Sequence, residues 1–179
     1  MRGLRHLLCG LFALVMLVNA GVATAAVTES DVKAAFLPRF ARYVTWPASA
    51  APSGSDPFVL CVIGSDPFGD GLDAAVRSQS VDGRRIVVRR LGSASNAGGC
   101  QIAYVGGAGS ESVGQLLAAL RGKPVLTVTD ARNGGARGII HFSVVDGRVR
   151  FSIDEADASR RGLNISSRLL ALALSVKQR

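Results

Sequence analysis

The stretch of this chain that comes closest to a nucleotide-binding site is VLCVIGSDPFG, at residues 59–69. Its two glycines have the spacing of a P-loop, G-x-x-x-x-G-K-[ST], in which backbone amides and the lysine bind phosphates. Asp70 and Gly71 stand where the lysine and the hydroxyl residue belong. The stretch therefore predicts an ordinary strand-to-helix turn, capped by Asp66 or Asp70, rather than a phosphate site.

A second glycine-rich turn, GGAGSES at residues 106–112, is the better candidate for binding a small anion. It follows a predicted strand and opens a predicted helix, whose free backbone amides could hold a carboxylate or a phosphate. If the two strands are neighbours, the two turns face each other across a topological switch point, where α/β sheets bind ligands. The candidate ligand crevice is then lined by Gly64, Ser65, Gly106, Gly107, Gly109 and Ser110. The alternative is a loop capped by Ser110 that binds nothing.

Residues suited to catalysis are scarce. Beyond the first 26 residues there is one histidine, His141, and its alternating strand pattern predicts a solvent-facing position rather than a base or a ligand. One histidine and two cysteines that are expected to be oxidised cannot assemble a transition-metal cluster, and the chain has no G-x-S-x-G elbow. The acidic pair Asp154 and Glu155 is better explained as a helix start. The sequence favours a protein that is not an enzyme and needs neither a metal nor another cofactor.

Residues 1–26 have the three parts of a cleavable secretory signal peptide: a basic start, an apolar run over residues 7–18 and an A-x-A site. The apolar run is too short to span a membrane as a helix. We expect cleavage after Ala25 or Ala26 and export to the periplasm, with a mature chain that does not itself span the membrane. Residues 27–179 are long enough for one domain with a proper core.

The charge of the chain favours an anionic surface or partner. It has 21 Lys and Arg against 13 Asp and Glu, and the signal peptide contains only two of the basic residues. Because the basic residues are scattered pairs, a solvated basic surface is a better explanation than a nucleic-acid site.

Cleavage leaves two cysteines, Cys61 and Cys100. An exported chain with an even pair of cysteines predicts one disulfide. Closing a loop of this length would stabilise the fold by about 4 kcal/mol in the chain-entropy account. The alternative is two buried free thiols.

The elements that would position these residues begin with an amphipathic helix at Thr28. Thr28 and Asp31 match an acidic variant of the capping box. Apolar residues then recur every four positions, at Val32, Phe36, Phe40 and Val44. Pro38 should kink this helix, and the Trp46-Pro47 pair should end it.

Apolar strand patterns then alternate with short helical ones. The predicted strands cover residues 57–64, 84–92, 100–107 and 123–130, and the predicted helices cover residues 70–78 and 112–121. Such alternation implies crossover connections, a mainly parallel sheet and an α/β fold in the form of a three-layer sandwich. In a 2-1-3-4 strand order the first and third strands are adjacent, which brings the two cysteines within reach of each other.

The C-terminal part changes pattern. Two strand runs in residues 138–154 are joined by Asp146-Gly147, a strong hairpin signal. A helical tail is predicted after them, with Ile165, Leu169, Leu172 and Val176 on one side and a stripe widened by Leu170, Ala173 and Leu174. A helix so apolar is either deeply buried or docked on something.

Two segments together suggest a partner interface. Large aromatic residues are common interface anchors, and Tyr43 and Trp46 stand near the end of the first helix. With Leu170 and Leu174 of the tail they form the candidate partner interface. The alternative is that both helices pack on the sheet or on a second copy of the chain.

Several segments together resemble the YfiR family of small periplasmic proteins. They are VKAAFLPRFARYVTWP, LCVIGSDPFG, GKPVLTVTD, GIIHFSVVDGRVRFSID and GLNISSRLLALA, and they span residues 32–176. Asp154 stands where the family often has asparagine, and the second cysteine pair of some members is missing.

The resemblance implies a periplasmic α/β sandwich that often dimerises. It also implies a regulator that represses a membrane-bound diguanylate cyclase by binding its periplasmic sensor portion, with redox state or a small ligand relieving repression. The expected partners are therefore an inner-membrane sensor protein and a second copy of the chain, with no nucleic acid. A competing hypothesis is a stand-alone periplasmic small-molecule-binding protein.

Overall fold

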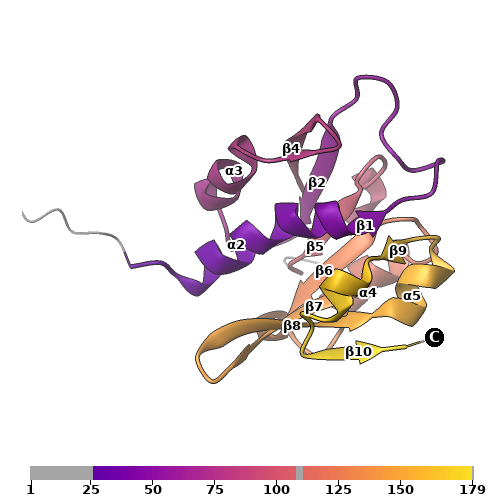
Figure 1. Cartoon of the computed structure of the whole chain (residues 1–179). Coiled ribbons are helices and arrows are strands. Elements are labelled where there is room, and N and C mark those ends of the chain that lie inside the picture. Colours follow the sequence, from indigo (N-terminus) through magenta and orange to yellow (C-terminus); the bar gives the residue numbers. More distant parts are fainter. Residues whose placement is uncertain (1–25, 108–110, 179) are drawn as a thin grey trace, which may run out of the picture.

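The computed structural model describes residues 26–107 and 111–178, and Figure 1 shows them as a mixed α/β sandwich built on one large curled sheet. Within these described residues the sheet has eight strands, in the order β10-β8-β7-β6-β5-β2-β4-β3. These strands are β2 (Phe58–Ile63), β3 (Ser80–Val81), β4 (Arg84–Leu91), β5 (Ile102–Val105), β6 (Leu126–Asp130), β7 (Ile140–Val145), β8 (Arg148–Asp154) and β10 (Ser175–Lys177). A separate two-stranded ladder joins β1 (Val44–Thr45) to β9 (Asn164–Ile165).

The helices are short. The α-helices are α2 (Glu29–Phe40), α3 (Asp70–Arg77), α4 (Val113–Ala119), α5 (Glu155–Arg160) and α6 (Ser167–Leu170). The 3₁₀ turns in the described residues are η1 (Ala41–Tyr43), η2 (Ala94–Asn96) and η3 (Ala131–Asn133).

The predicted parallel core is confirmed. β2 pairs in parallel with β4 on one side and with β5 on the other, and β5 pairs in parallel with β6. This is the 2-1-3-4 order expected from the alternation of apolar strands and helices. β7 extends the sheet in parallel with β6, while the β7–β8 and β3–β4 pairs are antiparallel.

Apolar side chains cover both faces of the sheet, which gives the expected three layers. On one face, α2 and α3 pack against β2, β5, β6, β7 and β8. On the other, α4 and η2 enclose a smaller core that includes both cysteines. Figure 1 shows α2 running across its face of the sheet. There Phe40 lies 5.7 Å from Phe142 and 5.2 Å from Phe151, measured between ring centroids.

Helix α2 begins as the sequence predicted. The Thr28 hydroxyl accepts the Asp31 backbone N–H, and the Asp31 carboxylate accepts the Thr28 backbone N–H. The α-helix ends at Phe40, two residues after Pro38, which lies in its last turn. It therefore ends earlier than the Trp46-Pro47 boundary, because Val44 and Thr45 leave the helical path to pair with β9.

The predicted hairpin is confirmed as β7 and β8. Its two-residue turn has positive φ at both positions, 50° at Asp146 and 70° at Gly147. A type I′ turn requires this backbone conformation, and Asp-Gly adopts it readily.

The C-terminal helix predicted over residues 165–176 is wrong in its extent. Only α6, four residues long, is α-helical there, and the chain then forms strand β10. β10 pairs in parallel with β8, and the Leu174 N–H donates to the Phe151 carbonyl at 2.7 Å. The spacing of the apolar residues is compatible with a helix or a strand, and pairing with the free edge of β8 favours the strand.

Candidate functional site

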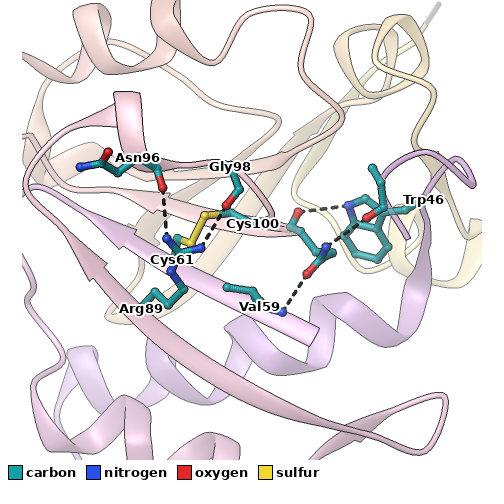
Figure 2. The surroundings of a disulfide bond; sticks show 9 residues. Trp46, Val59, Cys61, Arg89, Asn96, Gly98 and Cys100 are labelled. Atoms are coloured by element: carbon teal, nitrogen blue, oxygen red, sulfur yellow. Dashed lines mark hydrogen bonds between the residues drawn. A yellow bond between two sulfur atoms is a disulfide. The ribbon is translucent and has the colours of Figure 1, made fainter. Parts of the chain in front are cut away.

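The structure joins Cys61 to Cys100 in a disulfide with a Cα–Cα distance of 5.8 Å (Figure 2). Cys61 lies within β2 and Cys100 immediately precedes β5, so the adjacency of these two strands brings the sulfurs together. Both residues are buried, at 0% and 4% exposure. The bond therefore links two central strands from within the smaller core.

A second contact holds the loop that carries Cys100. Arg89 of β4 is paired in register with Cys61. Its guanidinium donates to the Gly98 carbonyl at 3.0 Å and to the Asn96 carbonyl at 3.2 Å, as Figure 2 shows. The loop is thus fastened to β2 by a covalent bond and to β4 by hydrogen bonds.

Trp46 is a core residue rather than an exposed interface anchor, which corrects the expectation from the sequence. It is only 9% exposed and packs edge-on against Phe58. Its indole N–H donates to the Gln101 carbonyl at 3.1 Å. In this position the ring has both an apolar contact and a hydrogen-bond acceptor, as a buried tryptophan requires.

Gln101 ties three segments together. Its side-chain carbonyl accepts the Val59 N–H at 2.7 Å, and its amide group donates to the Ala50 carbonyl at 3.0 Å. With the bond from Trp46, Gln101 joins its own segment, next to Cys100, to the start of β2 and to the segment after β1.

The two glycine-rich turns lie against each other, as the switch-point geometry requires. The Gly106 N–H donates to the Ile63 carbonyl at 2.9 Å, and a Cβ on Gly106 would come within 2.0 Å of the Ser65 carbonyl oxygen. Gly64 and Gly107 both have positive φ, 85° and 60°. Gly109 and Ser110 lie outside the described residues. Backbone packing explains why Gly106 is glycine, and anion binding at this crevice stays a prediction.

Replacing Gly106 by alanine tests that packing. We expect a loss of about 2 kcal/mol in the free energy of unfolding, because the new methyl group would force the two turns apart. Urea unfolding measures it, with Gly92→Ala as the matched control, since a Cβ on Gly92 meets nothing within 4 Å. Equal stability of the two variants would contradict the packing account.

The helix cap predicted at Asp66 or Asp70 is wrong, because the N-cap of α3 is Gly69 and no side chain caps it. Asp66 instead closes the turn that precedes the helix. Its carboxylate accepts the backbone N–H groups of Phe68 and Gly69 at 2.8 and 3.2 Å. Arg90 donates to Asp66 and to Asp73, and its hydrogen bond lowers the pKa of Asp73. Two acidic residues at this turn, Asp66 and Asp73, are therefore engaged within the fold.

His141 is buried, at 4% exposure, so the solvent-facing position predicted for it is wrong. Its Nδ1 lies 2.8 Å from the Thr129 hydroxyl of the neighbouring strand β6. Burial lowers the pKa of the ring, and the charge of Arg137 lowers it further. The first three residues of β7 are all buried, and their side chains alternate between the two faces, so both faces of the sheet are covered at the start of this strand.

Sequence reasoning missed a buried ionic cluster. Lys33 is 2% exposed and donates to the carboxylates of Asp130 and Glu29, and Arg132 donates to Glu29 as well. Two features of the sequence hinted at this burial. Lys33 adjoins Val32 of the apolar stripe, and Asp130 ends a buried strand. The cluster fixes the register of α2 against the end of β6.

Exposed leucines follow α6. Leu172 is 60% exposed and Leu174 48% exposed, whereas Leu170 and Tyr43 are partly buried against the larger core. The Ser166 N–H donates to the Tyr43 carbonyl at 2.8 Å, so the end of η1 and the start of α6 lie side by side. Three of the four predicted interface residues, all except Trp46, thus come from adjoining segments with some exposure.

A family model described as YfiR/HmsC-like matches residues 30–174 of the chain. The chain belongs to the YfiR/HmsC-like family. No curated protein matches the chain significantly.

The match of this YfiR/HmsC-like chain runs from the start of α2 almost to β10, so it includes the disulfide, the hairpin and α6. Within residues 26–107 and 111–178, no helix combines the length and the apolar character needed to cross a membrane. The same residues bring together no group of three His, Cys, Asp or Glu side chains that could hold a metal ion.

Proposed function

We propose that this chain is a non-catalytic periplasmic regulator that represses an inner-membrane diguanylate cyclase, or a similar sensor protein, by binding its periplasmic portion. Family membership supports the regulatory role. The observation that carries the contact mechanism is the exposure of Leu172 and Leu174, which follow the partly buried Leu170 in the chain. Large apolar side chains clustered on a surface are typical of protein interfaces.

Export supports the same proposal. Disulfides persist in oxidising compartments such as the periplasm, and the fold contains one between buried strands. The signal peptide proposed at residues 1–26 lies mostly outside the described residues. Redox state or a small ligand is the proposed control of repression, since either could act on the strand pair that the disulfide joins.

The contact mechanism predicts that lysine at the exposed leucines abolishes repression without unfolding the protein. Leu172→Lys and Leu174→Lys should leave the melting temperature within about 2 °C, because both side chains already face water. Repression should fall at least about tenfold, because a charge at an apolar contact must be desolvated. Cyclic di-GMP in cells that produce each variant measures repression, and calorimetry of the purified variant measures melting.

Two controls sharpen this experiment. Ala74→Lys places the same charge on an exposed position of α3 and should repress normally. Leu170→Lys should lower the melting temperature, because Leu170 packs against the core. If the leucine variants repress normally but lose self-association in sedimentation, the surface binds a second copy of the chain, and the contact mechanism is wrong.

One observation favours the alternative of a stand-alone small-molecule-binding protein. A cavity of about 480 Å³ opens beside Cys100, within the size range of ligand sites. Retention of a small molecule through purification, with unchanged cyclic di-GMP on deletion of the gene, would favour that function.

A further inference from the structure

We infer that the cavity beside the disulfide binds a small organic anion with an apolar body. The cavity has a volume of about 480 Å³ and lies between the segment that precedes β2, the loop that carries Cys100 and the turn before β6. It lies where the central strands begin, whereas the two glycine-rich turns follow the ends of β2 and β5. It is therefore a different site from the predicted crevice, and the inference does not rest on the proposed function.

Several residues in the walls of the cavity are constrained by ring closure, by the disulfide or by hydrogen bonds. Pro52, Pro57 and Pro124 line it, and each has a fixed φ. Cys100 and Gln101 line it too, the first through the disulfide and the second through its bonds to Val59 and Ala50. A ligand that enters loses little binding free energy to the ordering of the protein, which favours affinity for a small molecule.

The charges on the lining favour an anion. Lys123 and Arg89 both line the cavity, and Asp56 is the acidic residue among the lining residues described. Arg89 is oriented by its bonds to the Asn96 and Gly98 carbonyls. Lys123 is exposed, and its side chain has no hydrogen-bond or ion-pair partner in the described part of the chain, although its backbone bonds to Leu120 and Val125. Its ammonium group is thus available to a carboxylate or phosphate.

The rest of the lining determines the shape of the ligand. Val59, Val125 and the prolines present apolar surface beside the two cations. Ligand sites commonly combine mostly apolar walls with a few polar groups that orient the ligand. An apolar body with one anionic group fits this arrangement, while inorganic phosphate would leave the apolar walls unused.

The test uses the oxidised mature protein and two probes of similar shape, phenylacetate and phenethylamine. Titration followed by backbone amide chemical shifts should show saturable changes at Gly98, Gly99 and Val125 with phenylacetate. Phenethylamine should bind at least about tenfold more weakly, since it offers a cation to a cationic site.

Two variants test which positive charge binds the anionic group of the ligand. Lys123→Met should weaken phenylacetate binding about tenfold, the usual effect of losing a charged hydrogen bond. Arg121→Met removes the same charge two residues away, outside the lining, and should change affinity less than about twofold. Absence of saturable shifts, equal binding of the amine, or equal effects of the two variants would each overturn the inference.

Discussion

Replacement of both Cys61 and Cys100 by alanine is expected to lower the free energy of unfolding by about 4 kcal/mol, the loop-closure value for their spacing. The two residues are 39 positions apart and the bond joins β2 to the residue before β5. Without it the unfolded chain gains conformational freedom, and two buried positions lose packing atoms. Urea unfolding of the purified mature protein, without reductant, measures the change.

Reduction of the wild-type protein is the matched control, because it opens the same loop without changing the sequence. Its stability should fall by a similar amount, and the alanine variant should not respond to reductant. If the alanine variant and the reduced wild-type protein each lose less than about 1 kcal/mol, the disulfide does not restrict the unfolded chain as expected, and the loop-closure explanation is wrong.

Lys33→Met is expected to lower the free energy of unfolding by about 3 kcal/mol, because it leaves a buried carboxylate without its cation. Asp130 is 4% exposed and its bond to Lys33 is enclosed between α2 and the end of β6. The Asp130 carboxylate would keep only its bond from the Arg132 backbone N–H, at 3.0 Å, among the bonds described. Urea unfolding at neutral pH measures the loss.

Two further variants separate the buried charge from lost packing. Lys33→Met with Asp130→Asn should recover about half of the lost stability, because no charge then stays buried unpaired. Arg132→Met removes a cation that is 65% exposed from the same cluster and should cost less than about 1 kcal/mol. If the double variant is no more stable than Lys33→Met, the stability lost in Lys33→Met comes from packing, and the explanation by an unpaired buried charge is wrong.

The parallel core, the hairpin and the cap of α2 were predictable because each depends on local pattern. Apolar runs separated by helical spacing specify crossover strands, and Asp146-Gly147 specifies a tight turn. The position of Cys100 opposite β2 followed from strand order alone. These features need no knowledge of which distant side chains meet.

The features that sequence reasoning missed depend on distant contacts. Leu174 and Val176 have spacing that suits a helix or a strand, and only the free edge of β8 decides between them. Nothing in the sequence around Trp46 distinguishes a core position from an interface position. Its contacts with Gln101 and Phe58 decide, and those depend on the fold. Lys33 would ordinarily be assigned to the solvent face of α2, and its burial requires Asp130, 97 residues away.

Intracellular cyclic di-GMP in a deletion strain tests the central claim most directly. Deletion of the gene should raise cyclic di-GMP, and the full chain should restore the original level. A chain without residues 1–26 should fail to restore it, because the proposed contact is periplasmic. An unchanged level on deletion, or full restoration by the chain without residues 1–26, would contradict the account of a periplasmic repressor.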